Sequence, residues 1–298
     1  MFKLNPQHQK IGVFAPSSYI DEARFASGVD IIKQYGFDVS VHKQSYAKHR
    51  QSAGTHSDKL SALYGLHEDK SIGMIMAAGG GNRSLHLLDK IDYDRLNPDV
   101  VFCGYSDSTA LLFGFTQKID GFKGIYGPMV QNLSQLPKAD LDYFFALLKG
   151  DAQEYPFTDD TAVLQEGAAR GRLIGGTLSL LPCLTGTPYM PNSDGTILYI
   201  EDCCEETSRL DRMLAHLKLS LPFSRLSGII IGTFSKLQDT GRPFGFSIDD
   251  IIAEHIADFT GPVIKTAAFG HDKHMRALPC NVEAHLTALN GEAALSFI

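Results

Sequence analysis

Short apolar runs alternate with longer amphipathic segments through the first half of the chain. Four runs have the length and the β-branched content of buried strands. They cover residues 10–18, 37–42, 71–81 and 100–106. Four segments with helical spacing of their apolar residues follow them, at 21–37, 57–70, 82–98 and 107–118. Strands that alternate with helices in this way predict an α/β fold, in which a parallel sheet is covered on both faces and functional sites form at the carboxyl ends of the strands.

The second half begins after a polar, aperiodic stretch at 151–170, which we interpret as a linker. A segment rich in glycine and threonine, 171–191, is followed by three further strands and two helices. The strands are expected at 196–202, 226–234 and 262–270, and the helices at 206–220 and 247–259. The pattern therefore predicts an N-terminal α/β domain at 1–150 and a smaller, mixed α/β domain at 171–298.

Composition narrows the classes of function. Of the 298 residues 44% are hydrophobic, which is enough to build two ordinary cores. The net charge of −7 disfavours a nucleic-acid surface, because phosphate binding needs clustered lysine and arginine. The N-terminus has no signal-peptide pattern and no apolar run reaches the length of a membrane span. We therefore expect a cytoplasmic protein that binds neither nucleic acid nor membrane.

The five cysteines are odd in number and contain no CxxC pair. They lie mostly in apolar surroundings, at positions 103, 183, 203, 204 and 280. We expect buried thiols in a reducing compartment, with neither a zinc site nor a disulfide framework.

Ser106 occupies a turn between a strand and a helix, in the sequence GYSDST. A serine at this position is exposed at the sheet edge beside helix N-terminal N–H groups, which favour developing negative charge. The pattern is therefore typical of a nucleophile, with the N–H of Asp107 as an oxyanion donor. Ser106 or Asp107 could equally cap the following helix. The spacing is not the G-x-S-x-G elbow of α/β-hydrolases, and the residues alone leave both interpretations open.

A second glycine-rich turn, AAGGGNRS at 77–84, also follows a strand. Consecutive glycines let backbone N–H groups approach a ligand, as in an oxyanion hole or a phosphate cradle. The turn lacks the spacing of a dinucleotide-binding loop and the lysine of a Walker loop. A simple tight turn between a strand and a helix would produce the same pattern.

A serine nucleophile needs a base, and the base needs a carboxylate to orient it. Among the eleven histidines, His271 follows an apolar strand and a glycine, and His274 is its nearest competitor. Glu201 ends the strand TILYI, and a carboxylate placed there requires a partner. Glu205 is an alternative orienting group, and Asp202 could be the cap of the next helix.

Several segments together resemble the LD-carboxypeptidase family of serine peptidases, which also contains the microcin C immunity peptidases. They are IGVFAPSS, the glycine turn with LLDKID, GYSDSTALL, IYGPM, GRLIGGTLSLLPCLTGTPY, LYIEDCCEETSRLDRML and FGHDKHMRALP. They run in the family's order over nearly the whole chain. The resemblance implies a flavodoxin-like or Rossmann-like N-terminal domain that carries the serine, and a C-terminal α/β domain that carries the glutamate and the histidine.

The family's catalytic triad falls on Ser106, Glu201 and His271 of this chain. Its oxyanion hole, built from backbone N–H groups, falls on Gly80 or Gly81 and on Asp107. The resemblance also implies a homodimer, and it implies neither a metal nor an organic cofactor.

Two departures from the usual family pattern concern the substrate. The glycine turn reads AGGGNRS rather than a form close to RGGYG, and Gly80, Gly81, Asn82 and Ser84 partly match the immunity branch. DKHMRALP also replaces the common Thr-Lys-Pro form after the histidine. Asn82, Arg83 and Arg276 are candidate contacts for the substrate.

The expected substrate is a small peptide or muropeptide. The expected reaction is release of the terminal D-alanine of a muropeptide tetrapeptide by a serine carboxypeptidase during cell-wall recycling. Two alternatives are an immunity-type peptidase that cleaves the amide of a peptidyl or aminoacyl adenylate, and a two-lobed binding protein without catalytic activity.

Overall fold

The computed structural model describes residues 3–4 and 10–298, which divide into two compact units. The first unit comprises the described residues of Met1–Ala152 together with Arg276–Asn281, and the second comprises Gln153–Met275 and Val282–Ile298. The stretch 151–170, interpreted above as a linker, contains the strand β6 (Ala162–Gln165) and the start of β7 (Gly167–Thr177). Side chains along β6 alternate between exposed and half-buried, so this short edge strand lacks the continuous burial of the other strands' apolar runs.

The first unit is built on one sheet with the strand order β11-β5-β4-β3-β1-β2. Its strands are β1 (Lys10–Phe14), β2 (Val39–Val41), β3 (Ile72–Ala77), β4 (Val101–Gly104), β5 (Gly124–Tyr126) and β11 (Leu278–Cys280). The first five run parallel, and β11 pairs antiparallel with β5. The order 2-1-3-4-5 is that of flavodoxin-like folds. The predicted fold class is confirmed for this unit, although a C-terminal strand in its sheet was not predicted.

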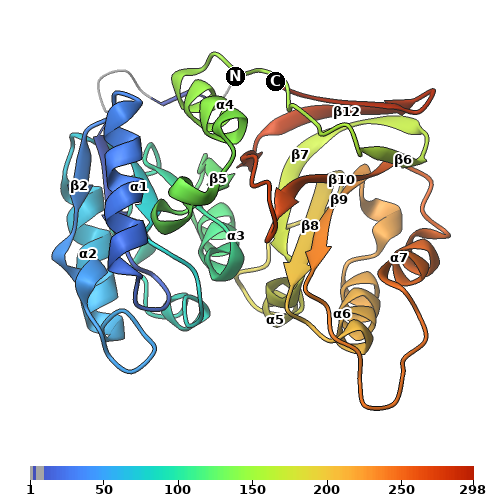
Figure 1. Ribbon diagram of the computed structural model, residues 1–298, viewed down its shortest axis with the longest axis horizontal. Helices are drawn as coiled ribbons and strands as arrows, with labels where there is room; N and C mark the ends of the chain where they lie inside the picture. The colour runs from blue at the N-terminus through green and yellow to red at the C-terminus, as the bar shows by residue number, and fades with distance from the viewer. Residues whose placement is uncertain (1–2, 5–9) are drawn as a thin grey trace. The chain divides into compact units, whose positions relative to one another are not determined.

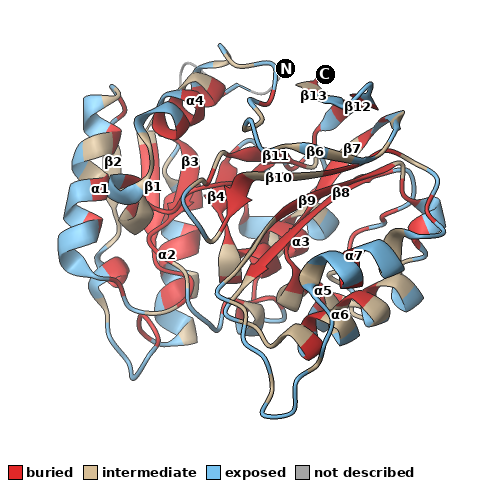
Figure 2. Cartoon of the chain, turned by 45° about the vertical axis from the view of Figure 1, so that its right-hand side comes forward, coloured by how far each residue is buried: buried red, intermediate tan, exposed pale blue. Residues whose placement is uncertain are grey.

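Four helices connect or cover these strands (Figure 1). They are α1 (Glu22–Gln34), α2 (His56–Glu68), α3 (Thr109–Lys118) and α4 (Lys138–Lys149). Asp21 caps α1 and a capping box between Thr55 and Asp58 begins α2, so each start is specified locally. Figure 2 shows that β1, β3 and β4 are buried, whereas α1 has a largely exposed outer face.

The prediction of a helix at 82–98 is wrong. This segment forms only two short 3-10 turns, at Leu85–Leu87 and Tyr93–Arg95. The Tyr64 hydroxyl accepts a hydrogen bond from the Asp92 N–H at 2.8 Å, and the Tyr93 hydroxyl donates to the Leu88 carbonyl at 3.0 Å. Side chains therefore occupy backbone groups that a continuous helix would pair with each other.

The second unit has a mixed sheet with the order β13-β12-β7-β8-β9-β10-β6. Besides β6 and β7, its strands are β8 (Ile197–Cys203), β9 (Gly228–Ser235), β10 (Val263–Gly270), β12 (Glu283–Leu289) and β13 (Glu292–Phe297). The strands β7 to β10 run parallel, and β6, β12 and β13 are antiparallel additions. The helices α5 (Leu181–Leu184), α6 (Thr207–Ser220) and α7 (Ile248–Ile256) complete this unit (Figure 1). The predicted mixed α/β fold is confirmed.

The cysteines are more exposed than the sequence predicts. Cys103 and Cys280 are buried, but Cys203 is half-buried, and Cys183 and Cys204 are exposed. None of the five forms a disulfide. Among residues 3–4 and 10–298, no helix has the length and apolar character needed to cross a membrane.

Candidate active site

Ser106 lies directly after β4, at the carboxyl edge of the first unit's sheet. Its backbone has a φ of +61°, in the left-handed region that serine rarely adopts. Such a conformation costs about 1–3 kcal/mol and is concentrated at functional sites. A 3-10 turn at Ser106–Ser108 leads into α3. The N-cap residue of α3 is Ser108, and its side chain makes no capping hydrogen bond. Neither Ser106 nor Asp107 is therefore the side-chain cap of α3.

The glycine turn after β3 approaches Ser106 closely. A Cβ added to Gly80 would lie 3.5 Å from the Ser106 Oγ, and one added to Gly81 would lie 2.0 Å from the Ser18 Oγ. Gly81 also has a φ of +118°, so no other residue fits there without strain. Within the described part of the chain, the N–H groups of Gly80, Gly81 and Asp107 donate to no other residue. They remain available to bind an oxyanion.

The carboxylate of Asp107 joins three strand ends behind Ser106. Its Oδ2 accepts hydrogen bonds from the Ser17 hydroxyl, after β1, at 2.6 Å and from the Ser84 N–H, after β3, at 2.8 Å. The Ser84 hydroxyl donates to the Asp107 carbonyl. Burial raises the pKa of Asp107, and these hydrogen bonds and the charge of Lys59 partly offset the rise. The carboxylate fixes the turn that holds Ser106 relative to the glycine turn.

Lys59 is a buried component of this cluster that the sequence analysis missed. Its side chain is fully buried, and its Nζ donates to the Ser17 carbonyl at 2.8 Å. Burial lowers the pKa of Lys59 from 10.5 to about 8, although the charge of Asp107 opposes the shift. Lys59 shares the inner stripe of α2 with Leu63 and Leu66, at spacings of four and seven residues. A lysine on an apolar stripe was the signal that could have identified it.

The depressed pKa of Lys59 predicts a pH-dependent difference in stability. Between pH 8 and pH 10.5 the unfolded chain still binds a proton that folded Lys59 has released, so the free energy of unfolding rises with pH. Replacing Lys59 with methionine removes this rise, which amounts to about 3 kcal/mol. Urea unfolding of both proteins at pH 8, 9 and 10.5 measures it. A wild-type minus variant difference that stays constant across this range contradicts the assignment.

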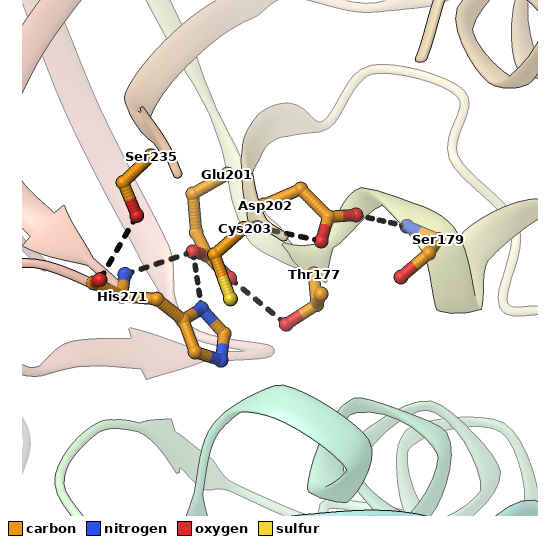
Figure 3. A network of polar contacts seen from close by, with 7 residues as sticks. All are labelled: Thr177, Ser179, Glu201, Asp202, Cys203, Ser235 and His271. Atoms are coloured by element: carbon orange, nitrogen blue, oxygen red, sulfur yellow. Dashed lines mark hydrogen bonds and ion pairs between the residues drawn. The ribbon is translucent and has the colours of Figure 1, made fainter. Parts of the chain in front are cut away.

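In the second unit, Glu201 and His271 form a buried pair (Figure 3). The Glu201 Oε2 accepts hydrogen bonds from the His271 Nδ1 at 2.7 Å and from the His271 backbone N–H at 3.2 Å. The Glu201 Oε1 accepts from the Thr177 hydroxyl at 2.8 Å, and the Ser235 hydroxyl donates to the His271 carbonyl at 2.9 Å. Because the Nδ1 proton points at Glu201, Nε2 is the ring nitrogen that can accept a proton.

The local sequence explains why these two side chains meet. Thr177 is in register with Glu201 on neighbouring parallel strands, so their side chains project together. Gly270 precedes His271 with a φ of +135°, and a Cβ there would lie 3.2 Å from the Glu201 Oε2. The glycine thus allows the strand end to approach the carboxylate.

The other candidate acids have different partners. Glu205 forms an ion pair with Arg209, 3.4 Å from Oε2 to the guanidinium. Asp202 accepts hydrogen bonds from the Ser179 and Cys203 N–H groups, both at 2.7 Å, and does not cap α6. Burial, with the charge of Glu201, raises the pKa of Asp202 to about 6.

The three candidate substrate contacts, Asn82, Arg83 and Arg276, do not lie in one place: the first two are in the glycine turn, and the third is in a buried ion pair. The Asn82 N–H donates to the Ser18 Oγ at 3.3 Å, and an Arg83 guanidinium nitrogen lies 3.4 Å from the His56 Nε2. Arg276 donates from Nε to the buried Asp140 at 2.9 Å. Arg83 is thus exposed beside the glycine turn, whereas Arg276 belongs to a buried ion pair of the first unit.

Two family models match this chain. The LD-carboxypeptidase N-terminal domain matches residues 11–127, and the LD-carboxypeptidase C-terminal domain matches residues 170–286. The chain belongs to the LD-carboxypeptidase family. It is accordingly a serine carboxypeptidase, and the alternative of a binding protein without catalytic activity is set aside.

Three relatives of this LD-carboxypeptidase family member align over most of their length. The "Probable murein peptide carboxypeptidase" of Bacillus subtilis is 27% identical over 296 residues, covering 96% of this chain and 91% of the relative. The murein tetrapeptide carboxypeptidase of Pseudomonas aeruginosa is 27% identical over 288 residues, with 92% of each covered. The microcin C7 self-immunity protein MccF of Escherichia coli is 28% identical over 312 residues, covering 92% and 89%.

A solved structure of MccF in its inactive mutant apo state has the same fold. It matches with a TM-score of 0.87 at 25% identity and covers 99% of this chain and 98% of that one. The family resemblance noted from the sequence is therefore confirmed.

The hydrogen bond between Glu201 and His271 predicts a raised pKa for the His271 imidazole, which can be measured directly. Burial alone lowers the pKa of His271, but the hydrogen bond and charge of Glu201 outweigh it, so the pKa is raised above 6.5. Replacing Glu201 with glutamine should bring the pKa below that of the wild type. An NMR titration of the imidazole in both proteins measures it, and equal pKa values contradict the pairing. Any reaction that needs a neutral His271 should slow as the pH falls through the raised pKa.

Proposed function

We propose that this enzyme is an LD-carboxypeptidase that releases the terminal D-alanine of muropeptide tetrapeptides during cell-wall recycling. The observation that carries the proposal is the left-handed Ser106 beside the available N–H groups of the glycine turn. The buried His271–Glu201 pair supplies the base and its orienting carboxylate. Family membership and the murein-peptide relatives support the choice of substrate.

In the proposed mechanism, His271 Nε2 takes the proton of the Ser106 hydroxyl as Oγ attacks the scissile carbonyl. The N–H groups of Gly80 or Gly81 and of Asp107 stabilise the oxyanion. His271 then protonates the leaving amine of D-alanine, and water hydrolyses the acyl-enzyme by the reverse proton transfers. Glu201 holds the imidazole in the tautomer that this sequence requires. The proposal requires the His271 Nε2 to come within hydrogen-bond distance of the Ser106 Oγ.

A substrate panel tests the proposed reaction. Purified enzyme is incubated separately with a muropeptide tetrapeptide, a tetrapeptide with L-alanine at its C-terminus, and an aminoacyl sulfamoyl adenosine. We expect release of D-alanine from the first alone. Cleavage of the sulfamoyl adenosine without D-alanine release would favour the alternative activity of an immunity-type peptidase. The similarity to MccF and the glycine-turn residues Gly80, Gly81, Asn82 and Ser84 are the observations that favour this alternative.

We also propose a cytoplasmic homodimer, as the family resemblance implies. Five cysteines without a disulfide suit a reducing compartment. Light scattering of the purified chain measures the oligomeric state, and a monomer mass of 32.6 kDa contradicts the dimer.

A further inference from the structure

A cationic cavity lies beside the glycine turn in the first unit. It has a volume of about 360 Å³ and is lined in part by His49, Arg50, Ser52, His56 and Arg83. The residues 49–52 form a tight turn, because the N–H groups of His49 and Ser52 each donate to the other's carbonyl, at 2.8 and 3.0 Å. The cavity is therefore built on hydrogen-bonded backbone rather than on a loose loop.

The charges around this cavity are unbalanced. Among the residues that the structure describes, no carboxylate forms an ion pair with Arg50 or Arg83. The nearby carboxylate of Asp58 is engaged by the Thr55 N–H and hydroxyl, at 2.8 and 2.7 Å. Burial, then the charges of Arg83 and other cations, lower the pKa of His56. Two arginines thus line this cavity, and no acidic residue is among its lining residues, in a chain of net charge −7.

We propose that this cavity binds a carboxylate of the peptide substrate through Arg50 and Arg83. Arginine is suited to this role, because its guanidinium donates two parallel hydrogen bonds to a carboxylate. Arg83 precedes Ser84, whose N–H binds the Asp107 carboxylate next to Ser106. The lining residue Arg83 is thus connected to Ser106 through Ser84 and the Asp107 carboxylate. The inference rests on the proposed function, and it adds a determinant of substrate specificity to it.

Binding to a non-cleaving enzyme tests the inference. Calorimetry measures the Kd of the muropeptide tetrapeptide for Ser106→Ala, and for the same protein with Arg50→Ala or Arg83→Ala added. We expect each arginine substitution to weaken binding about tenfold or more, since hydrogen bonds to charged groups are worth about 1.5–3 kcal/mol. Arg24→Ala is the matched control, because this exposed arginine of α1 pairs with Asp21 and does not line the cavity. It should leave the Kd unchanged.

Two amidated tetrapeptides identify the carboxylate that is bound. One has its C-terminal carboxylate amidated, and the other has its remaining carboxylates amidated. The analogue that lacks the bound carboxylate should bind more weakly, and Arg83→Ala should then have little further effect on it. Two results would overturn the inference. One is a loss of binding free energy from Arg83→Ala that simply adds to the loss from amidation for both analogues; the other is a tetrapeptide Kd that neither arginine substitution changes.

The same calorimetry with inorganic phosphate separates this inference from the proposed function. If the wild type releases no D-alanine, the proposed function fails. Phosphate binding that requires Arg50 and Arg83 would still support an anion site. If the wild type releases D-alanine but neither phosphate nor tetrapeptide binding depends on these arginines, the inference alone fails.

Discussion

Replacing Ser106 with alanine is expected to lower kcat for D-alanine release by a factor on the order of 10⁴ or more. Removing a serine nucleophile eliminates the acyl-enzyme route and leaves only the contribution of binding and of the oxyanion donors. The substitution removes one hydroxyl from a half-buried residue, and alanine meets a similar conformational penalty at a φ of +61°. The free energy of unfolding should therefore change little. Initial rates of D-alanine release, with thermal unfolding of the same samples, measure both quantities.

The neighbouring serine provides a matched control for Ser106. Ser108 lies in the same 3-10 turn, is fully buried, and its Oγ has no hydrogen-bond partner among the described residues. Ser108→Ala should keep kcat within a few-fold of wild type, because it removes no interaction. Loss of activity in both variants, or in Ser108→Ala alone, would point to a general disturbance of the turn and count against Ser106 as nucleophile.

Replacing Glu201 with glutamine is expected to lower kcat by a factor of about 10³ to 10⁴. The glutamine amide can present an N–H to the His271 Nδ1, which favours the tautomer that carries its proton on Nε2 and cannot act as the base. Thr177 can still donate to the amide oxygen, so the buried site keeps part of its hydrogen bonding. The kcat and KM for the tetrapeptide separate this effect from substrate binding, and KM should change much less than kcat.

Glu205→Gln is the corresponding control for Glu201. Glu205 pairs with Arg209 on the next helix, so its substitution should leave kcat close to wild type. If Glu205→Gln abolishes activity and Glu201→Gln does not, the orienting role belongs to Glu205. The NMR titration of His271 gives an independent check, since Glu201 is the group that raises its pKa most, through both its hydrogen bond and its charge.

Much of the fold is readable from the sequence, because its strands are continuous apolar runs. The run 72–77 is buried at every position, and the run 197–202 likewise, which is typical of parallel strands with both faces covered. The positions of Ser106, Glu201 and His271 at strand ends follow from the same pattern. The segment 82–98 was misread because two tyrosine hydroxyls, one from Tyr64 on α2 and one from Tyr93 within the segment, take part in its backbone hydrogen bonds.

The contacts that support the candidate site are mostly long-range, so local patterns do not report them. Ser17 and Asp107 are 90 residues apart, and Glu201 and His271 are 70 apart. Lys59 looks like a surface residue until α2 is placed with that face inward. The Glu201 pair was anticipated because a carboxylate after five apolar residues needs a partner, whereas Ser17 carried no comparable signal.

The strand β11 links the order of synthesis to the completion of the first unit. Its residues Leu278–Cys280 form the edge of a sheet whose other strands end by Tyr126, and Asn281 donates to the Phe122 carbonyl at 2.6 Å. During translation the edge of β5 therefore has no partner until almost the whole chain has left the ribosome. A fragment that stops at residue 152 would expose this same edge, and exposed strand edges promote aggregation. The nucleophile-bearing unit is therefore completed only near the end of synthesis, although most of it is made first.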